Sequence, residues 1–263
     1  MITQIPISSL LSKYIHDAAV FNFPTAVSMT RTIIPDGRAT LVINLNDSEG
    51  TLGGFAPPMK KYRPLVMGSQ THPVVYTLSP SARFVFIRFY PFGFNTLLGI
   101  SGHELLNRTV ELEELTGYRS TILENAMHRE QSDEGKIGQI IVWLEQRARK
   151  VSLPHELVLN VCQSIHKKEG RIHLADFCGG SYNTYKQLQR HFESATGLNA
   201  KLYARMVRFE AIVEWMRKNP QSDWFDLVAR FDLFDQSHLI KEFKCFSDFT
   251  PTRFLAKGIE QFV

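Results

Sequence analysis

Two short stretches decide the fold of the C-terminal half: Leu188-Gln-Arg-His-Phe192 and Leu239-Ile-Lys-Glu-Phe243. Both have the pattern Leu-x-basic-x-Phe, and they are separated by a constant offset of 51 positions that also places Tyr203 on Phe254. A leucine and a phenylalanine four positions apart share one face of a helix. A short apolar segment and a turn precede each copy, so the sequence predicts a helix-turn-helix unit that occurs twice.

The opposite face of each copy carries side chains of the types that contact DNA in recognition helices. Arginine or lysine pairs with guanine and glutamine pairs with adenine through two hydrogen bonds in the major groove. Thr184 and Asp235 stand just before the two helices as N-cap candidates, and Gln187 and Gln236 fall near the N-terminal ends that meet base edges. The predicted DNA-binding residues are Thr184, Lys186, Gln187, Gln189, Arg190, Gln236, Ser237, His238, Lys241 and Lys244.

Some neighbouring residues limit this surface. Tyr185 is expected in the core rather than at DNA, and His238 fits a capping or packing role as well as a base contact. Glu193 and Glu242 are expected on the outward face, where they would repel phosphate. Between the two copies, residues 201–217 predict one long helix with a buried stripe. If it holds the copies roughly 34 Å apart, both can enter successive major grooves.

The second copy resembles the second helix-turn-helix of the AraC/XylS family of regulators. The resemblance is carried by the Asp235-Gln-Ser-His238 run and by the tail Phe249-Thr-Pro-Thr-Arg-Phe254, and it extends from about Pro154 to Lys257. It implies a bacterial protein that binds promoter DNA and controls transcription initiation, which would make RNA polymerase a further partner. The departures are Asp232 and Asp248 in place of glycine, Ala200 in place of proline, and Gly179-Gly180 within the first short helix.

The N-terminal part has the sequence features of a β domain. Residues 39–45, 74–78 and 83–90 are short, rich in β-branched and aromatic side chains, and bounded by turn formers, which favours a sandwich or barrel. Ile33-Ile-Pro-Asp-Gly37, Leu41–Leu45 and Phe89–Gly99 resemble a cupin-like domain of unknown function that precedes such DNA-binding units. The resemblance implies a small β-barrel that senses an effector or dimerises, but it transfers no effector-binding residue.

These observations predict an α+β multidomain chain. The expected domains are a β-rich, cupin-like sensory or dimerisation domain (1–118), a helical connector (119–150) and an all-α double helix-turn-helix domain (151–263). The helical repeat of the connector, from Ile137 to Leu144, offers a second surface for a homodimer beside the N-terminal domain.

Composition limits the class of protein without deciding it. The 263 residues carry a net charge of +4, which permits a nucleic-acid partner but does not require one. No signal peptide and no apolar run of roughly 20 residues is found. The three cysteines are scattered, which favours a reducing compartment, so a cytoplasmic location without membrane contact is expected.

Nothing in the sequence indicates catalysis. His103-Glu104 and His155-Glu156 lack the second histidine of a zinc-binding helix and fit a solvated surface better. No phosphate loop or paired nucleophile occurs, so no enzyme activity, metal or cofactor is expected. Two alternatives to a regulator stay open. The first is a ligand-sensing or protein-interaction module with a degenerate helix-turn-helix, motivated by Asp232, Asp248 and the glycine pair. The second is a metal-dependent barrel enzyme.

Overall fold

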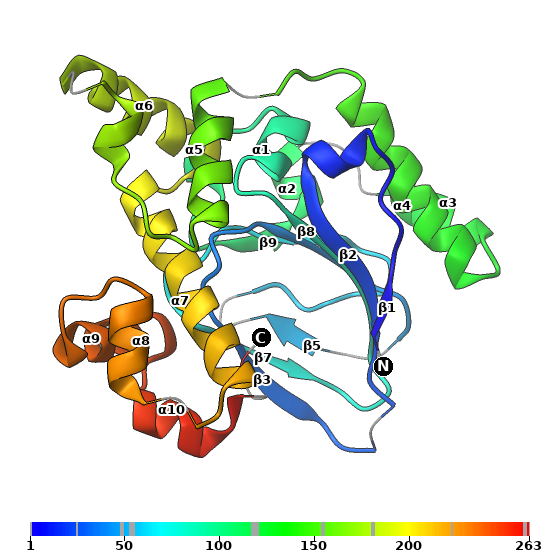
Figure 1. Cartoon of the computed structure of the whole chain (residues 1–263). Helices are drawn as coiled ribbons and strands as arrows, with labels where there is room; N and C mark the ends of the chain where they lie inside the picture. The colour runs from blue at the N-terminus through cyan, green and yellow to red at the C-terminus, as the bar shows by residue number, and fades with distance from the viewer. Residues whose placement is uncertain are drawn as a thin grey trace.

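The computed structural model has a sheet domain followed by a helical domain (Figure 1). It describes residues 2–24, 26–47, 50–52, 56–116, 121–153, 156–179, 182–221, 223–259 and 262. Pro154, His155 and Gly180, which the sequence analysis named, lie outside the described residues. The predicted combination of a β-rich N-terminal domain and an all-α C-terminal domain is confirmed.

The sheet domain contains two antiparallel sheets. The larger has the order β1-β2-β8-β4-β6-β9 and the smaller β3-β7-β5. The three strands that the sequence predicted individually are β4, β7 and β8, and the other strands were not predicted individually. The strands are β1 (Ile2–Gln4), β2 (Ile15–Asn22), β3 (Met29–Ile33), β4 (Thr40–Asn44), β5 (Gly50–Leu52), β6 (Leu65–Met67), β7 (Val74–Leu78), β8 (Arg83–Phe89) and β9 (Thr109–Glu111).

Four helices complete this domain: α1 (Gly93–Leu98), α2 (Leu112–Thr116), α3 (Thr121–Arg129) and α4 (Asp133–Ala148), with a 3-10 turn at Gly102–Glu104. The region expected as a connector packs on the sheet. Ile140 and Leu144 of α4 are 0% and 1% exposed and lie in the same apolar core as Ile15 and Phe89. This core already covers the part of the Ile137–Leu144 stripe that was considered for a dimer. Dimerisation through the N-terminal domain stays a prediction.

The helical domain contains α5 (Glu156–Lys167), a 3-10 turn (Leu174–Phe177), α6 (Tyr182–Thr196), α7 (Ala200–Lys218), α8 (Trp224–Arg230), α9 (Gln236–Ser247) and α10 (Pro251–Lys257). The two Leu-x-basic-x-Phe helices are α6 and α9, and α7 is the predicted long helix between them. Leu188 and Phe192 of α6 and Leu239 and Phe243 of α9 are at most 1% exposed, as the helical spacing predicted.

The backbone is left-handed at both positions where aspartate stands in place of the glycine of the resembled pattern. Asp232 and Asp248 have φ values of 52° and 64°, in the region where glycine has no steric cost. Gly197, the counterpart of Asp248, has a φ of 76°. The expectation that Gly179 lies inside a helix is wrong: the 3-10 turn ends at Phe177, and Gly179 follows it with a φ of 53°.

The two domains are packed closely against each other. Ile34 and Phe92 of the sheet domain belong to the apolar core of the helical domain. A Cβ on Gly102 would lie 2.0 Å from the backbone nitrogen of Gly197, so the 3-10 turn and the end of α6 meet backbone to backbone. Within the described residues, no helix combines the length and apolarity needed to cross a membrane.

Candidate nucleic-acid interface and interdomain pocket

The second predicted recognition helix, α9, presents most of its predicted contact residues to solvent. Asp235 is the N-cap, as expected, and its Oδ1 accepts a hydrogen bond of 2.7 Å from the backbone N–H of His238. This bond satisfies one of the free N–H groups at the start of the helix. Gln236, Ser237, Lys241 and Lys244 are exposed.

His238 and Glu242 differ from the expectation. Glu242 is 3% exposed rather than outward-facing, and Arg205 of α7 donates from Nε to its Oε1 at 3.1 Å. His238 Nδ1 accepts from the backbone N–H of Phe234 at 3.3 Å, and Nε2 lies 3.5 Å from Glu242. His238 therefore fixes the tip of α9, which is the capping role that the sequence left open. DNA contact by His238 stays a prediction.

The buried Glu242 carboxylate ties α9 to the long helix. Burial lowers the pKa of Arg205, but the hydrogen bond and negative charge of Glu242 outweigh this effect and the pKa is raised. Arg208, also on α7, lies 3.9 Å from the second carboxylate oxygen. Its pKa is lowered by burial. Because a buried carboxylate needs such partners, Glu242 holds α9 at a fixed place on α7.

The first predicted recognition helix, α6, has a different start from that expected. It begins at Tyr182, so Thr184 lies within the helix and is not its N-cap. Lys186, Gln187 and Arg190 are exposed. Gln189 is half-buried and donates to the Tyr185 hydroxyl at 3.0 Å, so part of its donor capacity is used within the helix.

The sheet domain lies against α6. Asn95 of α1 donates from Nδ2 to the carbonyl of Ala195 at 3.1 Å. His103, from the 3-10 turn, lines a shallow pocket together with Lys186, Gln187 and Arg190. The predicted DNA-contact surface of α6 therefore borders the sheet domain. By contrast, α8, α9 and α10 lie farther from α1 along α7 (Figure 1).

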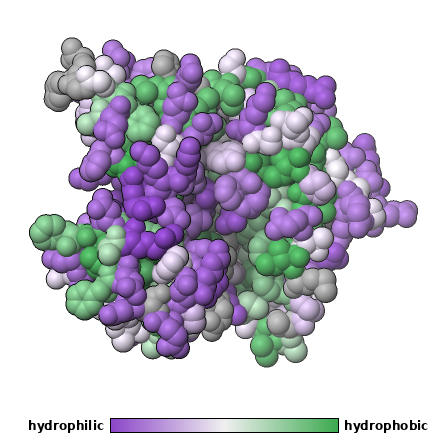
Figure 2. Space-filling view, in the orientation of Figure 1, coloured by the Kyte–Doolittle hydropathy of each residue, from purple (hydrophilic) through white to green (hydrophobic). Residues whose placement is uncertain are grey.

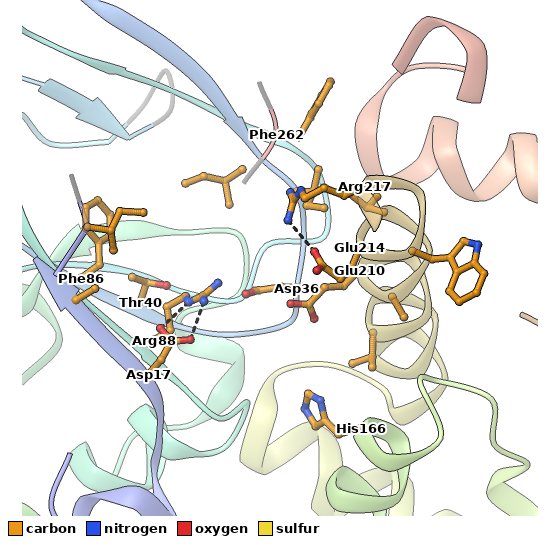
Figure 3. A pocket seen from close by; sticks show the side chains of 18 of the residues that line it. Asp17, Asp36, Thr40, Phe86, Arg88, His166, Glu210, Glu214, Arg217 and Phe262 are labelled. Atoms are coloured by element: carbon orange, nitrogen blue, oxygen red, sulfur yellow. Dashed lines mark hydrogen bonds and ion pairs between the residues drawn. The ribbon is translucent and has the colours of Figure 1, made fainter. Parts of the chain in front are cut away.

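A pocket of about 1010 Å³ lies between the domains (Figure 3). One wall is the open face of the sheets and the other is α7. Its aromatic and aliphatic lining includes Phe21, Phe23, Ile33, Tyr76, Phe86 and Phe262. Asp36, Arg88, His166, Glu210 and Glu214 add charged or polar groups to the lining (Figure 3).

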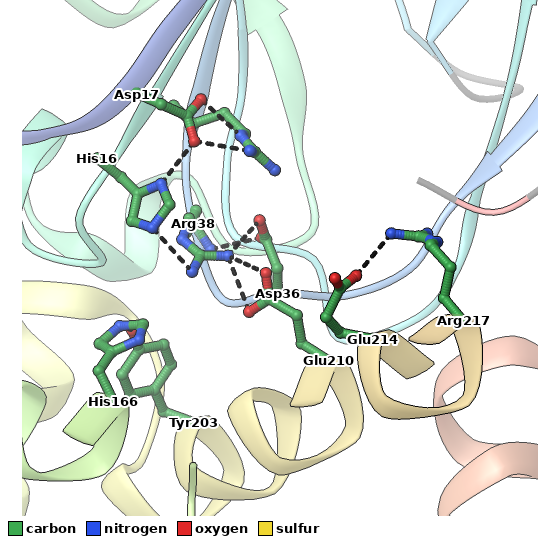
Figure 4. A network of polar contacts seen from close by, with 10 residues as sticks. His16, Asp17, Asp36, Arg38, His166, Tyr203, Glu210, Glu214 and Arg217 are labelled. Atoms are coloured by element: carbon green, nitrogen blue, oxygen red, sulfur yellow. Dashed lines mark hydrogen bonds and ion pairs between the residues drawn. The ribbon is translucent and has the colours of Figure 1, made fainter. Parts of the chain in front are cut away.

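Arg38 joins the two walls of this pocket. Its side chain is 3% exposed, and Nη1 donates to Asp36 at 3.0 Å and to the two Glu210 oxygens at 3.0 and 3.1 Å (Figure 4). Burial lowers the pKa of Arg38, but the two carboxylates outweigh it and the pKa is raised. The turn before it requires Gly37, since this residue has a φ of 72° and a Cβ there would lie 2.5 Å from the Tyr203 ring.

A second polar group extends the network onto the sheet. Arg88 donates from Nε and Nη2 to the two Asp17 oxygens at 2.9 and 2.6 Å. Burial raises the pKa of Asp17, but hydrogen bonds from His16 and Arg88 outweigh burial and hold that pKa well below its usual range. His16 Nε2 in turn lies 3.4 Å from Arg38 (Figure 4).

His166 of α5 faces this network from the helical domain. Its Nε2 shares a hydrogen bond of 2.5 Å with the Tyr203 hydroxyl. Burial, together with the electrostatic effect of Arg38 and His16, lowers the pKa of His166 to about 4. His166 is therefore neutral near pH 7.

None of these pocket residues was predicted from the sequence. Arg38 and Glu210 are 172 positions apart, and no local pattern links residues at that separation. Asp36 lies in the Ile33–Gly37 stretch that carries the N-terminal resemblance, but that resemblance assigned it no role. Among the described residues, no group of three or more histidine, cysteine, aspartate or glutamate side chains could hold a metal ion.

Comparison with known proteins gives two results. Residues 3–111 match the family model "Domain of unknown function (DUF6597)". None of the curated proteins matches the chain. The family match agrees with the expected N-terminal domain of unknown function, while its cupin-like nature stays a prediction.

Among solved structures, the chain is similar to ToxT from Vibrio cholerae. One ToxT structure, at 1.65 Å resolution, is 9% identical with a TM-score of 0.44, and the match covers 91% of this chain and 98% of that one. ToxT from strain O395 bound to (E)-4-(8-methylnaphthalen-1-yl)but-3-enoic acid is 10% identical with a TM-score of 0.46, over the same shares. An unsaturated fatty acid-bound ToxT is 10% identical with a TM-score of 0.42, covering 90% and 94%.

Proposed function

We propose that the chain is a sequence-specific DNA-binding transcription regulator of the AraC/XylS type, in which α6 and α9 enter successive major grooves. The observation that carries the proposal is the surface of α9. Its apolar side is buried on α7 and its N-terminus is capped by Asp235, while Gln236, Ser237 and Lys241 are exposed. A capped helix end with amide, hydroxyl and ammonium groups is suited to base edges and phosphates.

The first helix supports the same function with a smaller surface. Lys186, Gln187 and Arg190 are exposed on α6, and α7 connects α6 to the α8–α9 unit as one continuous helix. Because α6 borders the sheet domain, access of DNA to α6 depends on the position of that domain. The proposed DNA-binding surface thus includes both helices, with α9 the more accessible of the two.

The interdomain pocket supports control by a small-molecule effector. Its volume lies at the upper end of the range for ligand sites, and its lining combines apolar side chains with a few polar groups. One wall is α7, the helix that carries Arg205 and Glu210. A molecule bound there would contact both domains and so could change how the sheet domain lies against α6.

The test is binding of the full-length protein to duplexes selected from a randomised pool, measured by fluorescence anisotropy at several salt concentrations. Lys241→Ala and Arg190→Ala are compared with Lys13→Ala, an exposed lysine of the sheet domain. A lost phosphate contact should flatten the log–log salt slope by about one unit, and a lost base contact should cost about 1–3 kcal/mol and relax the preference at one position. Lys13→Ala should change neither.

The competing function is a protein-interaction module with a degenerate helix-turn-helix. The observation in its favour is the contact between α6 and the sheet domain, which occupies part of the first helix. Selection of no duplex by the folded full-length protein would support this module and reject the regulator.

A further inference from the structure

Phe234 is the most exposed large apolar side chain among the described residues, at 91%. It directly precedes Asp235, the N-cap of α9. Figure 2 shows hydrophobic surface over the α8–α9 region, next to hydrophilic surface over the neighbouring part of the molecule. A phenylalanine held in water contributes little to folding, and at the capped end of a candidate recognition helix its ring is accessible to a bound partner.

The ordinary structural role of an apolar residue at this position is excluded. A residue before the N-cap often packs against the fourth residue of the helix as a hydrophobic staple. In α9 that fourth residue is Leu239, which is already 1% exposed. A ring that is 91% exposed makes no such staple, so Phe234 does not contribute to the core.

The backbone of Phe234 is nevertheless fixed. Its N–H donates to His238 Nδ1 at 3.3 Å, and the N–H of His238 donates to Asp235 at 2.7 Å. His238 is held in turn near Glu242, which is buried against Arg205. The ring therefore projects from a rigid helix tip, and little conformational entropy is lost when it is covered.

The neighbours of Phe234 indicate what covers it. Ser237 and Lys241 are four positions apart and lie on one face of α9, and both are exposed together with Gln236. These groups hydrogen-bond base edges or phosphates, and the N-terminal end of a recognition helix is the part that approaches the bases. The apolar group displayed on the base edges of the major groove is the thymine C5-methyl, and phenylalanine is among the side chains that contact it.

We propose that Phe234 packs against the C5-methyl of a thymine in the major groove and thereby selects a T·A pair at one position of the site. This inference rests on the proposed DNA-binding function. It adds a van der Waals contact to the hydrogen-bonding contacts expected from Gln236, Ser237 and Lys241.

The test uses the full-length protein and one duplex selected from a randomised pool. Each thymine is replaced in turn by deoxyuridine, which keeps the base pair and removes only the methyl group. Wild-type protein should bind one such duplex roughly fourfold more weakly, the effect of one buried methyl group. Phe234→Ala should bind the thymine duplex more weakly and show no penalty for deoxyuridine at that position.

Phe225→Ala is the matched control, because Phe225 is 67% exposed but lies on α8. It should keep both the affinity and the deoxyuridine penalty. The methyl contact would be overturned if no thymine-to-deoxyuridine replacement weakened binding of the wild-type protein, or if Phe234→Ala kept the same loss of affinity on that replacement. Either outcome would leave the proposed DNA binding intact. Equal losses of duplex affinity in both phenylalanine variants would also overturn it, because the loss would then not be specific to the side chain that precedes the N-cap of α9. If no duplex is bound at all, the proposed function itself fails.

Discussion

Arg38 of the sheet domain and Glu210 of α7 form a two-oxygen contact at 3.0 and 3.1 Å, and Asp36 binds the same guanidinium nitrogen. The guanidinium group is almost completely buried, whereas both carboxylates remain half-buried at the edge of the pocket. The contact joins the domain that would sense an effector to the helix that connects the two predicted recognition helices.

Arg38→Met should destabilise the protein by about 3 kcal/mol, because it leaves Asp36 and Glu210 next to each other without their cation. Glu210→Gln should lower the free energy of unfolding by less, because Asp36 still neutralises Arg38 and the amide oxygen of the new glutamine can still accept a hydrogen bond from it. Urea unfolding followed by tryptophan fluorescence measures both changes. Glu214→Gln is the control, because Glu214 pairs with the exposed Arg217 and Lys218 of its own helix. Equal losses of unfolding free energy in the Glu210 and Glu214 variants would contradict a stabilising contact between Arg38 and Glu210.

His166 should make stability depend on pH between about 6.5 and 4. The unfolded chain protonates this histidine as the pH falls through 6.5, whereas the folded chain does so only near 4. The free energy of unfolding is therefore highest above pH 6.5 and falls as the pH drops to 4, by about 3 kcal/mol in total. Asp17 acts only in more acidic solution, because its pKa is lowered from 3.8.

The measurement is the urea midpoint at pH 7.5, 6, 5 and 4.5 for wild type and for His166→Gln. The variant should have a flatter profile in this window. His103→Gln, at an exposed site, should keep the wild-type profile. If the urea midpoint of His166→Gln depended on pH as strongly as that of wild type, a group other than His166 would be responsible for the pH dependence.

Gly102→Ala should separate α6 from the sheet domain. The added Cβ would meet backbone atoms of Thr196 and Gly197 at 2.5 Å or less, and backbone cannot move aside as a flexible side chain can. We expect a loss of about 1–3 kcal/mol and faster hydrogen exchange in the last turn of α6, with no change in α9. Gly138→Ala is the control, since nothing lies within 4 Å of its Cβ. It should stabilise α4, in which Gly138 is exposed, by about 0.5–1 kcal/mol.

Asp248→Gly should stabilise the helical domain by about 0.5–1 kcal/mol, because glycine adopts a φ of 64° without the steric cost that an L-residue has. Asp248→Ala should lower stability, since alanine tolerates this conformation less well than aspartate. Thermal unfolding of both variants measures the difference. If Asp248→Gly and Asp248→Ala both lowered the thermal stability, the aspartate side chain rather than the backbone conformation would determine stability at this C-cap.

Local sequence patterns were sufficient to predict several helices, strands and caps. The spacing of Leu188 and Phe192, repeated in Leu239 and Phe243, specifies a buried helix face whatever lies on the other side of it. Asp235 was recognised as an N-cap because its hydrogen bond reaches only three residues along the chain. Strands β4 and β7 were found because β-branched residues between turn formers favour extended backbone.

The contacts between groups that are distant in the chain depend on the tertiary structure. Periodicity placed Glu242 on a polar face, yet Arg205 of α7 binds it in the interior, because a partner from another helix makes burial of the carboxylate favourable. The same holds for α4, whose apolar stripe could cover a second chain or its own sheet, and covers its own sheet. Arg38, Glu210 and the pocket between the domains depend on segments far apart in the chain. Such contacts follow from how two folded surfaces fit together, a property that no local pattern of residues encodes.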